Sequence, residues 1–224
     1  MSKSISYAIT THNETDVLGE LINTLQAYIK EEDEMVILDD HSDNPQTCNI
    51  LKNLPNVHKS KFTGNYADHK NNLNNKCKKD YIFQLDGDEV PTELLLYNIK
   101  EIINSNDVDL IYLPRENIIN GIEDFHLKKW KWSKDDKDRI NYPDFQGRVY
   151  RNTEQIKWER PLHEYITGHV TWSKIPPNSG LDLIHIKDIE VQVQSNNRYD
   201  NDYDRNDNFS YRQSVTKQKD EDGK

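Results

Sequence analysis

The chain has 224 residues and a formal net charge of −10 at neutral pH, and this length allows one sizeable hydrophobic core. The negative charge argues against a protein that holds nucleic acid through its phosphates, because such a protein needs a basic face. The two cysteines, Cys48 and Cys77, lack the spacing of a metal or redox motif, which favours reduced thiols in a cytosolic protein.

The N-terminus enters a strand-like run almost at once, so we expect no signal peptide. No apolar run in the sequence approaches the roughly 20 residues of a membrane-spanning helix. We therefore expect a cytoplasmic protein without a transmembrane segment. Peripheral contact with the inner face of a membrane stays open, because a local basic patch can exist on an acidic protein.

The first half of the chain alternates strand and helix patterns. Apolar runs predict strands at 5–10, 35–40, 57–62, 81–86 and 108–113. Apolar residues three and four apart, or polar runs after a turn, predict the intervening helices, which are expected at 18–29, 45–54, 66–78 and 92–103. This alternation predicts an α/β fold of Rossmann-like type, with a mostly parallel central sheet and helices on both faces.

The pattern changes after residue 113. Residues 114–180 look irregular, hold all four tryptophans, and contain short strands such as 147–151. The aromatic residues suit either a hydrophobic core or a platform for sugar rings. Residues 195–224 are polar and rich in Asn and Asp, which predicts a flexible tail. We expect one domain over residues 1–194.

Acidic and polar residues recur where three of the predicted strands end. They form T-T-H-N-E at 10–14, D-D-H-S-D at 39–43 and D-G-D-E at 86–89. Carboxyl ends of parallel strands lie along one edge of a sheet, which is where α/β proteins place ligands. Asp86 and Asp88 could there hold Mn²⁺ or Mg²⁺, which in turn binds a diphosphate. Gly87 would let the backbone bend between them.

The order and spacing of these segments resemble family-2 glycosyltransferases with the A-type nucleotide-sugar fold. Lys70 stands where that family has an arginine, and Leu162 where it usually has a valine. Later segments are similar to lipopolysaccharide-core-type members. Those segments are Y-P-D-F-Q-G-R-V-Y-R-N at 142–152, P-L-H-E-Y at 161–165 and L-I-H-I-K-D at 183–188.

The resemblance implies a metal-dependent, inverting transfer of a sugar from a nucleoside-diphosphate donor to a hydroxyl group of a glycan or glycolipid such as lipopolysaccharide. UDP is the favoured nucleotide, with dTDP and GDP open. Residues 1–113 would form the nucleotide-binding half and residues 114–194 the acceptor-binding half. The implied nucleotide-binding residues are Thr11, Asn13, Glu14, Asp40, Lys70 and Asp86, and the implied ligands of Mn²⁺ or Mg²⁺ are Asp88, Asp86 and His185.

Such a displacement needs a base for the proton of the acceptor hydroxyl. The resemblance places Glu164 in this role. His163 could orient Glu164 or bind donor phosphate, and Asp144 is a reserve candidate for the base.

Two other readings stay open. A non-catalytic carbohydrate- or metal-binding module could use the same acidic residues, although the parallel α/β alternation and the lack of a calcium-loop motif count against it. A nucleotidyltransferase is less favoured, because its first strand usually leads into a glycine-rich loop and here leads into T-T-H-N-E-T. The sequence leaves the sugar and the acceptor undetermined.

Overall fold

The computed structural model describes residues 3–203. Its largest element is a seven-stranded sheet. The strands of this sheet are β1 (Ile5–Thr11), β2 (Glu34–Asp39), β3 (Val57–Lys59), β4 (Tyr81–Asp86), β6 (Leu110–Leu113), β8 (Gln146–Arg151) and β11 (Trp172–Lys174). Their order is β11-β6-β8-β4-β1-β2-β3, and β8 runs antiparallel to both neighbours whereas the other pairs are parallel.

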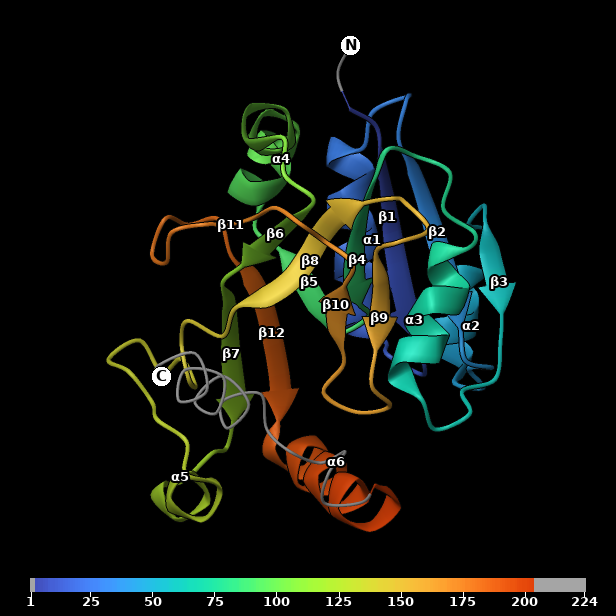
Figure 1. Ribbon diagram of the computed structural model, residues 1–224. Helices are drawn as coiled ribbons and strands as arrows, with labels where there is room; N and C mark the ends of the chain where they lie inside the picture. Colours follow the sequence, from blue (N-terminus) through green and yellow to red (C-terminus); the bar gives the residue numbers. More distant parts are fainter. Residues whose placement is uncertain (1–2, 204–224) are drawn as a thin grey trace.

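Two smaller sheets and the helices complete the described chain (Figure 1). A three-stranded sheet has the order β5-β12-β7, and β9 pairs with β10. These strands are β5 (Glu89–Pro91), β7 (Arg115–Asn120), β9 (Lys157–Glu159), β10 (Tyr165–Thr167) and β12 (Leu183–Asp188). The helices are α1 (Asp16–Tyr28), α2 (Pro45–Leu51), α3 (Tyr66–Asn74), α4 (Glu93–Asn106), α5 (Asp124–Trp130) and α6 (Ile189–Asp202).

The central strands are buried on both faces, because successive side chains of a strand point to opposite sides. In β1, Ile5, Tyr7 and Ile9 pack with the apolar faces of α1 and α4. Ala8, from the same strand, packs on the other side with α3 and the β9–β10 hairpin. The fold prediction is therefore confirmed: helices cover both faces of a mostly parallel sheet.

Polar side chains fix where several helices begin. The side chain of Asn44 accepts hydrogen bonds from the backbone N–H groups of α2, Asn65 does so for α3, and Thr92 for α4. Such caps satisfy donors that have no partner inside the helix. The cap at Asn44 holds the start of α2 close to the end of β2, so the loop that carries Asp40 is short.

Three expectations need adjustment. Residues 114–180 are more regular than predicted, because β7 pairs with the distant strand β12 over six residues. The boundary between residues 194 and 195 falls inside α6, so the predicted tail is helical as far as Asp202; residues 204–224 lie outside the described part. The two predicted halves also share one sheet, since β8 lies between β4 and β6.

Candidate active site

A large cleft of about 1330 Å³ opens at the carboxyl ends of the central strands. Figure 1 shows α5 and α6 beyond this edge, following the adjacent ends of β7 and β12. Every site residue expected from the sequence lines the cleft: Thr11, Asn13, Glu14, Asp40, Lys70, Asp86, Asp88, Asp144, His163, Glu164 and His185. The sheet thus brings together residues that are distant in sequence.

Asn13 joins the loop after β1 to the loop after β2. Its Oδ1 accepts hydrogen bonds from the backbone N–H groups of Asp43 at 3.0 Å and Asn44 at 2.9 Å. Its own N–H donates to Ser42 Oγ at 2.9 Å. Asn13 has a φ of 66°, a left-handed conformation that asparagine tolerates better than most residues. The side chain expected to contact nucleotide is therefore engaged in fixing the two loops.

The other residues after β1 satisfy one another. Glu14 Oε2 accepts hydrogen bonds from Thr11 Oγ1 at 2.5 Å and from the backbone N–H of His12 at 2.6 Å. Burial raises the pKa of Glu14 despite these bonds. Asp40 uses one oxygen for the N–H of Phe62 at 2.7 Å. Its other oxygen lies 3.7 Å from the ring of His12, so Asp40 keeps hydrogen-bonding capacity toward the cleft.

The D-G-D turn after β4 lies directly against the end of β1. A Cβ on Gly87 would come within 3.0 Å of Glu14 Oε2 and 3.1 Å of the Thr10 carbonyl oxygen. The N–H of Gly87 donates to that carbonyl at 2.8 Å. This close approach favours glycine, whereas the backbone conformation does not demand it, because the φ of Gly87 is not among the positive values of the described residues.

Both carboxylate oxygens of Asp86 form hydrogen bonds or ion pairs with protein groups. Its Oδ1 accepts hydrogen bonds from Thr10 Oγ1 at 3.0 Å and Gln84 Nε2 at 2.9 Å, and its Oδ2 lies 2.7 Å from Arg148 Nη2. Lys70 Nζ is 3.2 Å from Oδ1. Burial opposes ionisation of Asp86, but Arg148 and Lys70 hold its pKa well below the usual range. Both oxygens are therefore occupied by protein partners.

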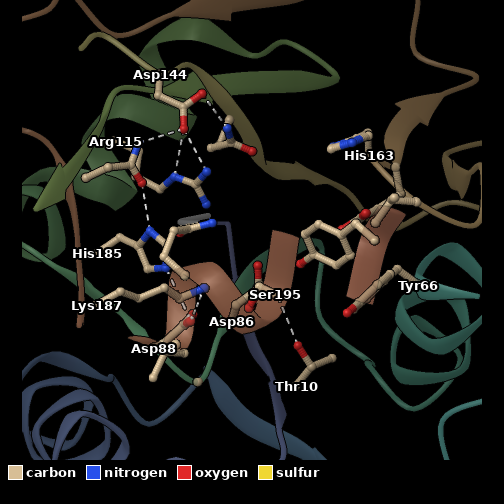
Figure 2. A pocket seen from close by; sticks show the side chains of 18 of the residues that line it. Thr10, Tyr66, Asp86, Asp88, Arg115, Asp144, His163, His185, Lys187 and Ser195 are labelled. Carbon is tan, nitrogen blue, oxygen red and sulfur yellow. Dashed lines mark hydrogen bonds and ion pairs between the residues drawn. The ribbon is translucent and has the colours of Figure 1, made fainter. Parts of the chain in front are cut away.

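A buried charge network lies under Asp86. Arg148 donates to Asp86, Gln84 and the fully buried Glu89. Glu89 also pairs with Arg115 at 2.7 Å. Arg115 continues the network to Asp144, with its Nε at 3.1 Å and Nη2 at 2.7 Å from Asp144 Oδ2. Asp144, the reserve candidate for the base, is thus committed to an arginine, as Figure 2 shows.

Asp88 faces the imidazole of His185 and the ammonium group of Lys187, both from β12. Its Oδ2 lies 3.2 Å from His185 Nε2 and 2.9 Å from Lys187 Nζ. Burial alone would raise the pKa of Asp88, but these two neighbours hold it far below its usual range. Asn117 donates from Nδ2 to Asp144, so its Oδ1 accepts from His185 Nδ1 at 2.7 Å. That bond orients the ring so that its Nε2 faces Asp88.

Asp88 and His185 could together hold a divalent cation only if it took its remaining ligands from a substrate. No group of three His, Cys, Asp or Glu side chains suited to a metal occurs within residues 3–203. Mg²⁺-type ions are commonly bound through one or two carboxylates together with phosphates of the substrate, and imidazole is a usual ligand of transition metals. A cation held here would therefore need further ligands from a bound substrate.

Glu164 and Lys70 form an ion pair across the cleft. Lys70 Nζ lies 2.6 Å from Glu164 Oε1 and 4.6 Å from the centre of the Trp158 ring. Lys70 is nearly fully buried, whereas the Glu164 side chain is 16% exposed. His163 is adjacent, in a left-handed conformation with a φ of 53°. Figure 2 shows His163 and Tyr66 on the opposite side of the pocket from Asp144 and Arg115.

Sequence reasoning missed Arg148, Arg115 and Lys187. Arg148 directly precedes the apolar pair Val149 and Tyr150 in β8, and a charge at a buried strand position requires a partner. Lys187 follows His185 by two residues in one strand, so both side chains point to the same face. These two signals could have been found in the sequence, whereas Arg115 gives no comparable local signal.

Comparison with known proteins identifies the family of this chain. The family model for glycosyl transferase family 2 matches residues 6–170. The chain belongs to glycosyl transferase family 2. The matched segment of this family-2 chain contains the D-G-D turn, Lys70 and Glu164 and ends before His185 and Lys187.

Two relatives from Staphylococcus aureus illustrate the similarity. Poly(ribitol-phosphate) beta-N-acetylglucosaminyltransferase TarP, from strain N315, is 31% identical over 116 residues, which is 49% of this chain and 36% of TarP. The crystal structure of TarS residues 1–349 in complex with UDP-GlcNAc superposes with a TM-score of 0.55 at 16% identity, over 84% of this chain and 59% of that one. The family-2 chain thus spans less than two thirds of each, and the TarS likeness shows the fold alone.

Within residues 3–203, no helix combines the length and the apolar character needed to cross a membrane.

Proposed function

We propose that the chain is an inverting glycosyltransferase that moves a sugar from a UDP-linked donor to a hydroxyl group of a glycan. The observation that supports this most is that Asp40, Asp88 and Glu164 line one cleft at the carboxyl edge of a family-2 domain. UDP-GlcNAc is a reasonable first donor, because TarS was crystallised with it. TarP itself acts on poly(ribitol phosphate).

The residues have separable tasks in this proposal. Asp40 keeps one oxygen toward the cleft and would accept a hydrogen bond from the base or ribose. Asp88 and His185 would hold Mn²⁺ or Mg²⁺, which supplies positive charge to the leaving diphosphate when it is bound. Asp86 supports the site from below, because both of its oxygens are taken by protein groups.

Glu164 would act as the base. Its carboxylate takes the proton of the acceptor hydroxyl as that oxygen forms a bond to the anomeric carbon. The bond from the anomeric carbon to the diphosphate oxygen breaks at the same time, and its electron pair leaves with UDP. Lys70 holds Glu164 in place through the 2.6 Å ion pair, so the carboxylate is oriented before the acceptor arrives.

Calorimetric titration of UDP tests the donor site. We expect the wild type to bind UDP with Mn²⁺ and to bind it far more weakly with EDTA. Asp88→Ala should behave like the EDTA sample. Asp68→Ala removes an exposed carboxylate outside the cleft and should bind like wild type. Absence of UDP binding would overturn the proposal, and binding that ignores both metal and Asp88 would overturn the role of the cation.

Turnover of UDP-GlcNAc then tests the base. Glu164→Gln should keep UDP affinity while its rate falls by about 10² to 10⁴. Glu159→Gln, an exposed pair member in β9, serves as the matched control and should keep the rate. A simple carbohydrate-binding module would show no turnover to lose, so the same experiment separates the enzyme from a binder.

A further inference from the structure

A basic and aromatic segment stands at the rim of the cleft in an otherwise acidic protein. Residues 125–134 read F-H-L-K-K-W-K-W-S-K, with four lysines and no acid, while the whole chain carries −10. The segment comprises most of α5 and the turn that follows it. A concentration of like charge this local produces an attractive field only over about a Debye length, roughly 10 Å at moderate salt.

Three of these lysines have no anionic partner among residues 3–203. Lys134 pairs with Asp138 at 2.9 Å, but Lys128, Lys129 and Lys131 form no ion pair with any described residue. All three are exposed. Lys128 and Lys129 stand in the last turn of α5, so their charges have no local role beyond favouring the helix end. They are free to bind an external anion.

The two tryptophans of the segment line the cleft. Lys129, Trp130 and Trp132 are among the residues that line it. The two indole rings lie 4.8 Å apart between centroids, and the ring of His126 lies 5.3 Å from that of Trp130. Such rings present apolar faces suited to the CH groups of a sugar or polyol, and their N–H groups suit its hydroxyls.

The turn that follows α5 is anchored on the sheet. The N–H of Ile140 donates to the carbonyl of Asn117 in β7 at 2.8 Å, and the N–H of Asn141 to that of Ser133 at 2.8 Å. The buried Arg139 pairs with Glu116 at 2.9 Å. Because β7 is the neighbour of β12, which carries His185, α5 and the turn after it are tied to the strands that form this part of the cleft, and Figure 1 shows α5 following the end of β7.

We infer that the segment 125–134 binds the acceptor, and that this acceptor is a polymer of phosphodiester-linked sugars or polyols. This inference rests on the proposed function and names its substrate class. The free lysines would bind successive phosphates, and the tryptophans the polyol units between them. A neutral glycan would make no use of Lys128, Lys129 and Lys131.

A thin anionic chain fits this rim better than a membrane surface does. Glu123 and Asp124 precede the segment and Asp136 and Asp138 follow it, all exposed. A broad anionic bilayer that met the lysines would meet these acids as well, whereas a single chain can follow the lysines alone. Trp130 and Trp132 line the cleft, so their rings are directed away from a bilayer outside it.

The test measures binding of a fluorescent poly(glycerol phosphate) oligomer to the full chain by anisotropy. The wild type should bind it, bind a dextran oligomer of the same length much more weakly, and lose affinity between 50 and 500 mM salt. The variant Lys128→Gln/Lys129→Gln/Lys131→Gln should bind the phosphate oligomer about tenfold more weakly. UDP titration with Mn²⁺ should give wild-type affinity for this variant.

A second triple variant controls for net charge. It carries Gln in place of Lys30, Lys52 and Lys78, three exposed lysines outside the cleft, and should bind the oligomer like wild type. Equal losses in both variants, or dextran binding as tight as that of the phosphate oligomer, would overturn the inference. So would tight binding of phosphatidylglycerol vesicles that depends on the three rim lysines while the oligomer stays unbound. Failure of the wild type to bind UDP would instead refute the donor site.

Discussion

Arg148→Met removes the cation at the centre of the buried network. Arg148 is 3% exposed and donates to Gln84 at 2.5 Å, Asp86 at 2.7 Å and Glu89 at 2.6 Å. Methionine keeps much of the apolar length of the side chain but none of the donors. The substitution therefore leaves two carboxylates with one cation fewer in a site that water reaches poorly.

The expected loss of stability is about 3 kcal/mol, at the lower end of the roughly 3–5 kcal/mol found when one partner of a buried ion pair is removed. Two features put the expected loss of stability at the lower end of this range. Glu89 keeps Arg115 at 2.7 Å and Asp86 keeps Lys70 at 3.2 Å, so neither carboxylate becomes unpaired. Arg148 also leaves its own Nε without a hydrogen-bond partner among the described residues, and that cost disappears with the side chain.

Urea unfolding of both proteins measures this difference. Glu89→Gln added to Arg148→Met should recover part of the loss, because one of the two carboxylates is then neutral. Arg151→Met is the matched control in the same strand. Its guanidinium is 27% exposed and pairs with the surface acid Asp107, so its loss should cost about 1 kcal/mol or less.

The penalty should also depend on pH. The pKa of Asp86 is lowered by Arg148 and Lys70, so its ionisation stabilises the wild type above the unfolded pKa of about 3.9. That stability is lost only as the pH falls through the lower folded value. Without Arg148 the folded pKa rises, so the penalty should be largest at pH 7 and shrink toward pH 4. A loss below about 1 kcal/mol, or one that grows as the pH falls, would refute this account.

Three further outcomes are expected. Lys187→Met removes the cation 2.9 Å from Asp88, so Mn²⁺ should bind roughly tenfold tighter in the presence of UDP. Paramagnetic resonance of free Mn²⁺ measures this affinity, and unchanged or weaker binding would contradict the prediction. Gly168→Ala should lower the free energy of unfolding by about 2 kcal/mol or more in a thermal melt. The reason is that φ of Gly168 is 78° and the new Cβ would lie 1.8 Å from the Gln155 carbonyl oxygen. A variant as stable as the wild type would contradict this backbone conformation. Burial raises the pKa of Glu14, so the stability it contributes at low pH is lost as the pH rises through that value; Glu14→Gln should be more stable than wild type at pH 7 and equal to it near pH 4.

Much of the site could be predicted because its parts follow strands with clear local patterns. The apolar run 81–86 and the D-G-D turn placed Asp88 at a strand end, and parallel alternation placed that end beside Asp40. The roles assigned to these residues stay predictions. The hydrogen-bond partners of each side chain could not be predicted. Asn13 and Asp86 line the cleft, but their polar atoms bind other protein groups.

Local sequence patterns were enough to predict the strands and helices of the first half, their order and the sheet edge that carries the acids, because side-chain periodicity and chain handedness are local properties. The tertiary structure alone decided which distant strands pair. Insertion of β8 between β4 and β6 brings Arg148 under Asp86, and pairing of β7 with β12 brings His185 and Lys187 to Asp88. Such partners depend on packing between segments far apart in the chain, which no local pattern records.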